Sequence, residues 1–364
     1  MGDTRVMQAD SIDSRALRAF REGAVIPALP LALTEQRTLD ERHQKAVIRY
    51  YIDAGAGGIA VGVHSTQFEI RDPSIALFRP VLELAARTID EWSQRRERRI
   101  LKIAGAVGRT VQAVREAELA LAAGYDACLV GLSALPLAAE PELVDHCRAI
   151  ARVIPILGFY LQPAVGGRLL SRSFWRRFAE IENVIGIKIA PFNRYQTLDV
   201  VRGVCEARAE GRITLYTGND DNLLVDLLTP YRIPTEDGVR EVRIAGGLLG
   251  QWGVWTSRAV ELLGRVHEIT RSGSSIPQEM LGLSIEITDA NAALFDAAHA
   301  FAGVIPGIHE VLRRQGLFRG IWCLDPGLTL SPGQADEIDR ACSAYPHLTD
   351  NGFVRQNLAE WLDG

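Results

Sequence analysis

A single lysine in the middle of a short apolar stretch is the residue of this chain best suited to covalent chemistry. Lys188 lies in the run 183–191, where isoleucines at 185, 187 and 189 alternate with Gly186, Lys188 and Ala190. The alternation and the β-branched side chains predict a buried strand with one bulky face and one small face that carries the lysine. A lysine held in a low-dielectric cavity loses proton affinity and becomes an amine nucleophile that forms Schiff bases with carbonyl compounds.

Lysine is rare in this chain, which contains only Lys45, Lys102 and Lys188. Lys45 lies in a charged helix start, and we expect it to be a solvated surface charge. Lys102 shares the apolar surroundings of Lys188 and is a rival for the imine lysine. Because it closely follows the charged run 95–99, we expect it at the beginning of its strand, with an ammonium group that reaches water.

Composition restricts the class of protein. The chain has 364 residues, 47% apolar and 23% charged, which is typical of a soluble globular protein. A formal net charge of −5 argues against nucleic acid as a partner, and no apolar run is long enough to span a membrane. The N-terminus is polar and does not show the apolar core of a signal peptide, and the five scattered cysteines favour free thiols over disulfides or a zinc site. We therefore expect a cytoplasmic protein without a metal or cofactor.

The hydrophobic pattern predicts eight alternating strands and helices, which is typical of a (β/α)8 TIM barrel. An open doubly wound sheet is the competitor, but the chain lacks a glycine-rich turn after its first strand. We expect an N-terminal arm at 1–22, the barrel at 23–272 with a polar loop at 229–240, and a C-terminal helical region at 273–364 that packs on the barrel. The predicted strands are 23–30, 59–63, 100–107, 127–132, 155–162, 184–190, 213–217 and 242–247, and the predicted helices are 40–54, 74–93, 110–123, 141–151, 174–180, 195–209, 222–228 and 254–269.

Chemistry in such barrels takes place at the carboxyl ends of the strands. The candidate residues are therefore those that end each predicted strand. They are His64, Ser65, Thr66, Gly105–Gly108, Ser133, Tyr160–Gln162, Lys188–Pro191, Gly218–Asp221 and Gly246–Gly247.

Three of these segments, in their order and spacing, resemble the dihydrodipicolinate synthase / N-acetylneuraminate lyase family of class I Schiff-base pyruvate aldolases. Residues 186–188 are similar to the family's G-[IVL]-K strand, 160–163 to its Y-N-x-P strand end, and 103–108 to its I-A-G-x-G segment. The resemblance covers the chain from about residue 23 onward. It implies that Lys188 forms an imine with a 2-oxo acid, that Tyr160 relays protons beside it, and that the protein is a homotetramer or homodimer.

The segment after the second strand departs from the family pattern G-[TS]-[TS]-G-E. Ser65 and Thr66 match the hydroxyl pair that would hold the substrate carboxylate, but His64 and Gln67 stand where glycines are expected. The rim of the pocket must therefore differ. His64 is either an acid/base or substrate contact, or a hydrogen-bonded structural histidine. A metal site is not expected because no partner ligands accompany it.

Two further segments bear on the substrate. Residues 131–136 lack the tyrosine of true dihydrodipicolinate synthases, and Arg168 is displaced from the expected arginine position, which argues against a dicarboxylate-like aldehyde. Gly218–Asp221 resembles the G-x-D-E segment of sugar-acid lyases, which implies that Asp220 and Asp221 bind substrate hydroxyls. The alternative is that these carboxylates cap the following helix.

The sequence thus predicts a lysine-dependent carbon–carbon lyase, aldolase or dehydratase that acts on a 2-oxo acid, with a hydroxylated, sugar-acid-like substrate among the options. A second hypothesis is a barrel enzyme that binds a phosphorylated substrate through the backbone of Gly246–Gly250, without imine chemistry. A third is a barrel that binds a keto acid without turnover.

Overall fold

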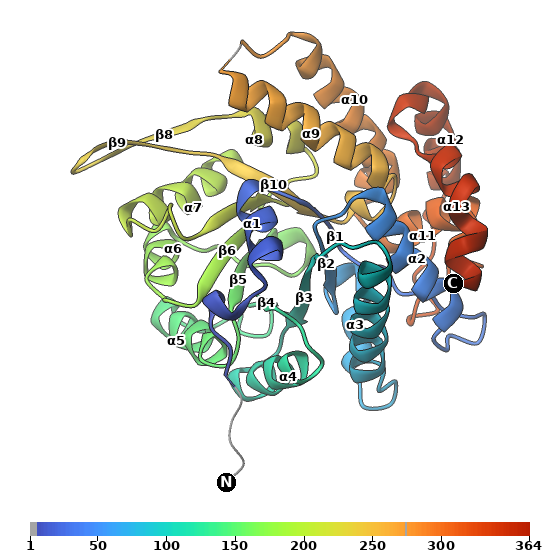
Figure 1. Ribbon diagram of the computed structural model, residues 1–364, viewed down its shortest axis with the longest axis horizontal. Helices are drawn as coiled ribbons and strands as arrows, with labels where there is room; N and C mark the ends of the chain where they lie inside the picture. Colours follow the sequence, from blue (N-terminus) through green and yellow to red (C-terminus); the bar gives the residue numbers. More distant parts are fainter. Residues whose placement is uncertain (1–5, 274) are drawn as a thin grey trace.

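The predicted barrel is present in the computed structural model, which describes residues 6–273 and 275–364; residues 1–5 of the predicted arm and residue 274 lie outside the described residues. Its eight parallel strands are hydrogen-bonded in the order β1-β10-β7-β6-β5-β4-β3-β2, and a bridge between Ala28 and Ala60 joins the two ends (Figure 1). The strands are β1 (Val25–Pro27), β2 (Gly58–Val61), β3 (Leu101–Ala106), β4 (Ala127–Val130), β5 (Ile156–Leu161), β6 (Val184–Ala190), β7 (Thr214–Thr217) and β10 (Ile244–Leu249).

Helices connect successive strands and cover the outside of the barrel. Several begin at a side chain that accepts from the free backbone N–H groups of the first turn: Asp40 before α2, Ser171 before α6 and Asn193 before α7. These helices are α2 (Glu41–Ala54), α3 (Phe78–Arg95), α4 (Thr110–Ala122), α5 (Glu140–Ala151), α6 (Arg172–Ala179), α7 (Arg194–Glu206), α8 (Leu223–Leu228) and α9 (Thr256–Ser272). Short 3-10 helices follow some strands, namely η2 (His64–Thr66), η3 (Phe68–Arg71), η4 (Pro163–Val165) and η5 (Gln251–Gly253).

The predicted N-terminal arm contains η1 (Ala9–Ser11) and α1 (Ser14–Glu22), which packs into the barrel. Ile12, Ala16 and Phe20 belong to the same buried cluster as the inward-facing strand residues. The ring of Phe20 stacks on Tyr216 with centroids 4.7 Å apart, and the Tyr216 hydroxyl donates to the Phe20 carbonyl at 2.7 Å. Helix α1 therefore closes the end of the barrel opposite to the carboxyl ends of the strands.

The prediction that residues 229–240 form a polar loop is wrong. This stretch forms an antiparallel hairpin, β8 (Tyr231–Thr235) and β9 (Gly238–Val242), that projects from the barrel (Figure 1). One face of this ribbon is exposed, whereas the other carries the buried Ile233 and Val242 and lies where β8 contacts α7. The stretch contains Pro230, Pro234 and Gly238 among charged residues, which is why its composition resembled a loop.

The C-terminal region is helical, as predicted, and consists of α10 (Glu279–Leu294), η6 (Ala297–His299), α11 (Val304–Arg314), α12 (Gln334–Ala344), η7 (Pro346–Leu348) and α13 (Asn351–Asp363). Helix α13 packs on α2 and is attached through Asp53, whose carboxylate accepts from Trp92 Nε1 at 2.9 Å and from Trp361 Nε1 at 2.8 Å. Within the described ranges, no helix is long and apolar enough to cross a membrane.

Strand β6 has the two predicted faces along most of its length. Lys188 and Ala190 point into the barrel, while Ile187 and Ile189 lie in the core between strands and helices. The prediction that Ile185 shares this outer face is wrong, because the pairing with β5 shifts there: Ile156 pairs with Val184, and Leu157 pairs with Gly186. The extra residue, Ile185, belongs to the inner cluster.

Candidate active site

A small cavity of about 70 Å³ lies at the carboxyl ends of the strands and contains Lys188. The barrel and the C-terminal region both contribute to it. The barrel residues that line it include His64, Ser65, Phe159, Lys188, Gly218 and Asp220, and the C-terminal residues are Phe295, Phe301, Val304 and Ile308. The region between α10 and α11 therefore covers the opening of the barrel above the lysine.

Lys188 is held as a nearly isolated amine. Its side chain is 8% exposed, and its Nζ lies 4.4 Å from the centroid of the Phe159 ring. Within the described part of the chain, Nζ has no hydrogen-bond or ion-pair partner. Burial lowers the pKa of Lys188 to about 8, and the negative charge of Asp220 opposes this effect. A substantial fraction of the amine is therefore neutral and nucleophilic near neutral pH.

Gly218 provides the space that the lysine side chain occupies. A Cβ atom at this position would lie 2.7 Å from Lys188 Cε and 2.8 Å from Ala190 Cβ. The backbone N–H of Gly218 donates to the Ile189 carbonyl at 2.7 Å, which fixes the end of β7 against the end of β6. Any side chain at 218 would displace the amine from its place.

Asp220 is the carboxylate that faces Lys188. It is 5% exposed, and its Oδ1 accepts from the backbone N–H of Gln251 at 3.4 Å. Burial raises the pKa of Asp220 to about 7, and the positive charge of Lys188 opposes this effect. Because a difference of 1 pKa unit corresponds to about 1.4 kcal/mol, a proton can pass between groups with such similar pKa values at little cost in free energy.

His64 and Ser65 begin the 3-10 helix η2 beside the lysine. Neither side chain has a hydrogen-bond partner among the residues that the structure describes. Desolvation, followed by the positive charge of Lys188, lowers the pKa of His64 to about 4, so its imidazole is neutral at physiological pH. A neutral imidazole and an unpaired hydroxyl can accept or donate a hydrogen bond to a ligand.

Thr66 lies outside the cavity, in contrast to Ser65. Its hydroxyl donates to the Leu29 carbonyl at 2.7 Å and accepts from the Gly62 backbone N–H at 3.0 Å. These bonds hold the loop that presents Ser65. Of the two predicted carboxylate-binding hydroxyls, the structure brings only that of Ser65 to the lysine.

Tyr160 also lies away from Lys188, and the expectation that the two are neighbours is wrong. The residue paired with Lys188 across β5 and β6 is Phe159, so Phe159 points inward and Tyr160 points outward. The Tyr160 hydroxyl donates to the Leu170 carbonyl at 3.3 Å and accepts from the Leu170 N–H at 3.2 Å. Its ring packs against Trp175 of α6, with the ring centroids 5.3 Å apart. Alternate residues of β5 share a face, as predicted, but the face that enters the barrel is the one that carries Phe159.

The remaining predicted residues also lie outside the lysine cavity. Asp221 is exposed and does not line it. Lys102 belongs to the outer layer near the beginning of β3, and its Nζ forms an ion pair with Asp90 at 2.7 Å. Lys45 is 3.7 Å from Glu41 on the surface of α2. Lys188 is thus the lysine of the chain whose amine faces this cavity.

The glycines proposed for phosphate binding serve packing. A Cβ at Gly246 would lie 2.5 Å from the Ala24 carbonyl oxygen, and one at Gly247 would lie 2.5 Å from the Trp252 ring. The N–H of Gly247 donates to the Ala24 carbonyl within the sheet. Moreover, the backbone N–H of Gln251, which follows this segment, already donates to the Asp220 carboxylate.

Four aromatic residues of the site were absent from the prediction, namely Phe159, Phe192, Phe295 and Phe301. Phe192 and Phe301 meet edge to face with centroids 5.8 Å apart. Phe159 and Phe192 lie beside the ends of predicted strands, and this position could have identified them as site residues. Phe295 and Phe301 come from a distant segment, and no local pattern in the sequence connects them with Lys188.

The comparisons with known proteins agree with this architecture. The sequence model of the Dihydrodipicolinate synthetase family matches residues 21–229, more than half of the chain. A 4-hydroxy-tetrahydrodipicolinate synthase of Thioalkalivibrio sulfidiphilus is 32% identical over 132 residues, which cover 36% of this chain and 43% of that relative. The match thus spans less than half the length of this curated relative.

Solved structures share the fold across nearly the whole chain. The chloride-inhibited dihydrodipicolinate synthase of Acinetobacter baumannii, complexed with pyruvate, has a TM-score of 0.70 at 19% identity, covering 88% of this chain and 98% of that one. CdNal of Clostridium difficile, in complex with mannosamine, has a TM-score of 0.67 at 17% identity, covering 89% and 99%. At these identities the similarity concerns the fold.

Proposed function

The chain belongs to the dihydrodipicolinate synthetase family, and from this we propose that it is a class I aldolase or lyase in which Lys188 forms an imine with pyruvate or a closely related 2-oxo acid. The observation that carries the proposal is the unpaired, buried Lys188 amine in a small cavity at the carboxyl ends of the strands. Its lowered pKa makes the amine a nucleophile near neutral pH.

The reaction begins when the neutral amine of Lys188 attacks the C2 carbonyl of the oxo acid. Loss of water gives a protonated imine, which draws electrons from the C3–H bond or from the C3–C4 bond. Asp220 is the group placed to take and return the protons of these steps, since it faces the amine and its pKa is raised by burial. The Ser65 hydroxyl is the candidate donor to the substrate carboxylate.

The size of the lysine cavity limits the part of the substrate that it can hold. Its volume of about 70 Å³ corresponds to roughly five water molecules, since a cavity needs about 10–15 Å³ in this measure to hold one. A three-carbon oxo acid suits this space, whereas a polyhydroxylated chain does not. Because Asp221 lies outside the cavity and Asp220 faces the lysine, the two carboxylates do not form the expected pair for vicinal hydroxyls. We therefore assign Asp220 to proton transfer.

Borohydride trapping tests the proposal. Incubation with pyruvate and sodium borohydride is expected to reduce the imine to a stable secondary amine, and peptide mass spectrometry is expected to find it on Lys188. The variant Lys188→Met should form no adduct, while Lys45→Met, which removes an exposed lysine, should behave as the wild type. An adduct on Lys102 would move the site, and no adduct would leave a barrel that binds its ligand without imine chemistry.

Assembly into a homodimer or homotetramer stays a prediction from the family resemblance. The β8–β9 hairpin is a candidate contact for a second copy, because this two-stranded ribbon projects from the barrel with one face exposed (Figure 1). Light scattering on the purified chain measures the mass of the assembly directly. A monomer would rule out this prediction and leave the lysine chemistry unaffected.

A further inference from the structure

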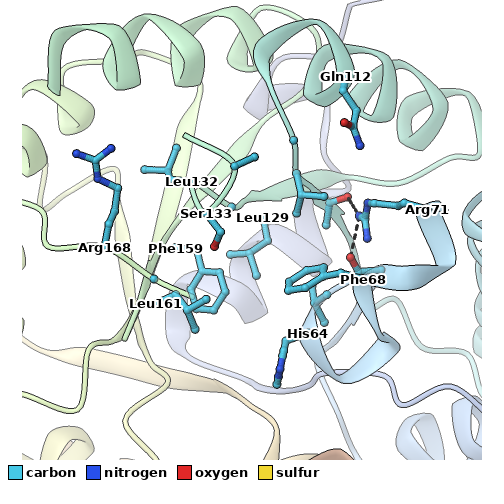
Figure 2. A pocket seen from close by; sticks show the side chains of 18 of the residues that line it. His64, Phe68, Arg71, Gln112, Leu129, Leu132, Ser133, Phe159, Leu161 and Arg168 are labelled. Atoms are coloured by element: carbon cyan, nitrogen blue, oxygen red, sulfur yellow. Dashed lines mark hydrogen bonds between the residues drawn. The ribbon is translucent and has the colours of Figure 1, made fainter. Parts of the chain in front are cut away.

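A second and larger cavity adjoins the one that contains Lys188. Its volume is about 320 Å³, and it lies at the carboxyl ends of β2, β3, β4 and β5. The two cavities share the side chains of Val63, His64, Phe159 and Leu161 as common walls. Figure 2 shows this larger cavity with His64 and Phe159 at one side. The part of a substrate that extends beyond the imine carbon at Lys188 can therefore pass His64 and enter the larger cavity.

The walls of this second cavity are mainly apolar. The large side chains that form them are Phe68, Leu129, Leu132, Phe159, Leu161 and Leu170. Sugar hydroxyls or an ionised group placed against such walls would lose hydration without gaining partners. The walls therefore favour an apolar ligand group.

The two arginines that line the cavity are already engaged. Arg71 Nε lies 3.0 Å from the Glu116 carboxylate, and both side chains are less than a tenth exposed. Arg71 Nη2 donates to the carbonyls of Gly62 and Gly105, the two bonds drawn in Figure 2. Arg168 donates through Nη1 to the Leu135 carbonyl. The charge of Arg71 is thus neutralised inside the protein by Glu116. Arg168 has no ion-pair partner among the described residues, but Figure 2 shows its guanidinium directed away from Phe68 and Phe159.

Two guanidinium nitrogens of these arginines have no hydrogen-bond partner among the described residues, namely Nη1 of Arg71 and Nε of Arg168. Both atoms are buried, so they add no accessible donor to the apolar walls.

The volume indicates a ring. An apolar cavity of about 150 Å³ in another protein binds benzene, and the present cavity has about 320 Å³. It can hold a substituted benzene ring or two fused rings. The rings of Phe68 and Phe159 on its walls provide faces and edges for aromatic packing.

We propose, on the basis of the imine chemistry proposed above, that this cavity binds the aldehyde half of the substrate and that this half is aromatic. In the cleavage direction, the neutral imidazole of His64, in the wall between the two cavities, takes the proton of the C4 hydroxyl. The C3–C4 bond breaks, its electron pair passes into the protonated imine on Lys188 to give the enamine, and C4 leaves as the aromatic aldehyde. Condensation is the reverse, and neither direction changes the oxidation state of the protein.

A panel of aldehydes tests the proposal with the full-length protein and pyruvate. Benzaldehyde and 2-naphthaldehyde are compared with glyceraldehyde, glyceraldehyde 3-phosphate and succinic semialdehyde, and the condensation products are measured by liquid chromatography. We expect kcat/KM for the aromatic aldehydes to exceed that for the others by about 10-fold or more, the discrimination that a complementary apolar pocket supports. Faster condensation with a hydroxylated, phosphorylated or carboxylated aldehyde would overturn the proposal.

A variant pair at Ser133 connects the preference with this cavity. Ser133 lies on an exposed stretch of the cavity lining, and Figure 2 shows its hydroxyl directed toward Phe159. Ser133→Phe places a ring in the cavity from an exposed position, and it should lower kcat/KM for benzaldehyde about 10-fold or more. Ser133→Ala, the matched comparison, removes the hydroxyl without filling the cavity, so its kcat/KM should exceed that of Ser133→Phe by about the same factor. If Ser133→Phe is as active with benzaldehyde as Ser133→Ala, the aldehyde lies elsewhere.

Trapping with borohydride separates the two proposals. Lys188 should form the pyruvate adduct equally well in the wild type and in both Ser133 variants, because the lysine cavity is untouched. Absence of the adduct in the wild type refutes the imine mechanism itself. An adduct on Lys188 without preference for aromatic aldehydes refutes only the assignment of the second cavity.

Discussion

Replacement of Gly218 by alanine is the most direct test of how the lysine is positioned. The added Cβ would lie 2.7 Å from Lys188 Cε, whereas ordinary van der Waals contacts in proteins are 3.4–4 Å. The lysine side chain must therefore move, because the other close atom, Ala190 Cβ at 2.8 Å from the added Cβ, is fixed to the backbone of strand β6. Optimal carbon–carbon separations of about 3.5–4.0 Å imply a displacement of about 0.8 Å or more at Cε.

The magnitude follows from this displacement. Overpacking of one methyl group in a filled site costs about 1–3 kcal/mol of stability, which a barrel of this size can tolerate. A misplacement of about 1 Å at a reacting group costs roughly 100-fold in rate. We therefore expect Gly218→Ala to fold and to lose about two orders of magnitude in the rate of pyruvate-imine formation.

The assay is the rate of borohydride trapping at a fixed pyruvate concentration, together with urea unfolding. Gly264→Ala is the matched control: Gly264 is an exposed residue in the middle of α9, and a Cβ there would meet nothing within 4 Å. This control should gain about 0.5–1 kcal/mol in the free energy of unfolding and keep the wild-type trapping rate. A Gly218→Ala protein that traps pyruvate at the wild-type rate would refute the role of this glycine.

Two further predictions concern the proton-transfer groups. The Asp220 carboxylate raises the pKa of Lys188 above the value that burial alone would give. In Asp220→Asn, the pH at which the trapping rate is half-maximal should therefore move about 1 pH unit or more below 8. Turnover of the same variant should fall about 100-fold or more. A shift to higher pH would contradict the pairing of these two groups. Tyr160→Phe should trap pyruvate at the wild-type rate, because the phenol bonds to Leu170, and it should lower the free energy of unfolding by about 1–2 kcal/mol because two buried backbone groups lose their partner. Loss of trapping in this variant would return the tyrosine to the mechanism.

The barrel was predictable because its strands and helices repeat a local signal. Each buried parallel strand is a short run of β-branched and small residues, and each is followed by a helix with its own beginning and end, as Asn193 shows for α7. The hairpin at 231–242 was missed because Pro230, Pro234 and Gly238 among charged residues are typical of a loop. Its alternation is limited to a few residues around the buried Ile233 and Val242, and its two-residue turn is formed by Glu236 and Asp237.

The site was predictable only in part, because both faces of a barrel strand are buried. Along β5, Leu157, Phe159 and Leu161 enter the barrel, while Gly158 and Tyr160 face the helices. Polarity does not distinguish these faces, since each carries apolar and aromatic residues. The rings of Trp175 and Phe178 would lie about 3 Å from a Cβ at 158, so close helix packing requires glycine there, and this requirement fixes which face is outside. That information resides in α6 and is not visible in the strand.

The inward position of Phe159 has a consequence for how the lysine is activated. Full burial of a lysine lowers its pKa by up to about 3–5 units; here burial lowers the pKa of Lys188 to about 8, and the negative charge of Asp220 opposes this effect. The ring face of Phe159, 4.4 Å from Nζ, also favours a cationic nitrogen. At physiological pH, part of the Lys188 amine is therefore neutral and can react, and the nitrogen can still gain and lose a proton. Once the oxo acid has reacted, the nitrogen is cationic again as a protonated imine, and the same ring and carboxylate stabilise that intermediate. Phe159 and Asp220 thus oppose deprotonation of the amine and also stabilise the protonated imine from which the carbon–carbon bond breaks. Loss of Asp220 should therefore speed the capture of pyruvate at low pH and slow turnover in the same variant.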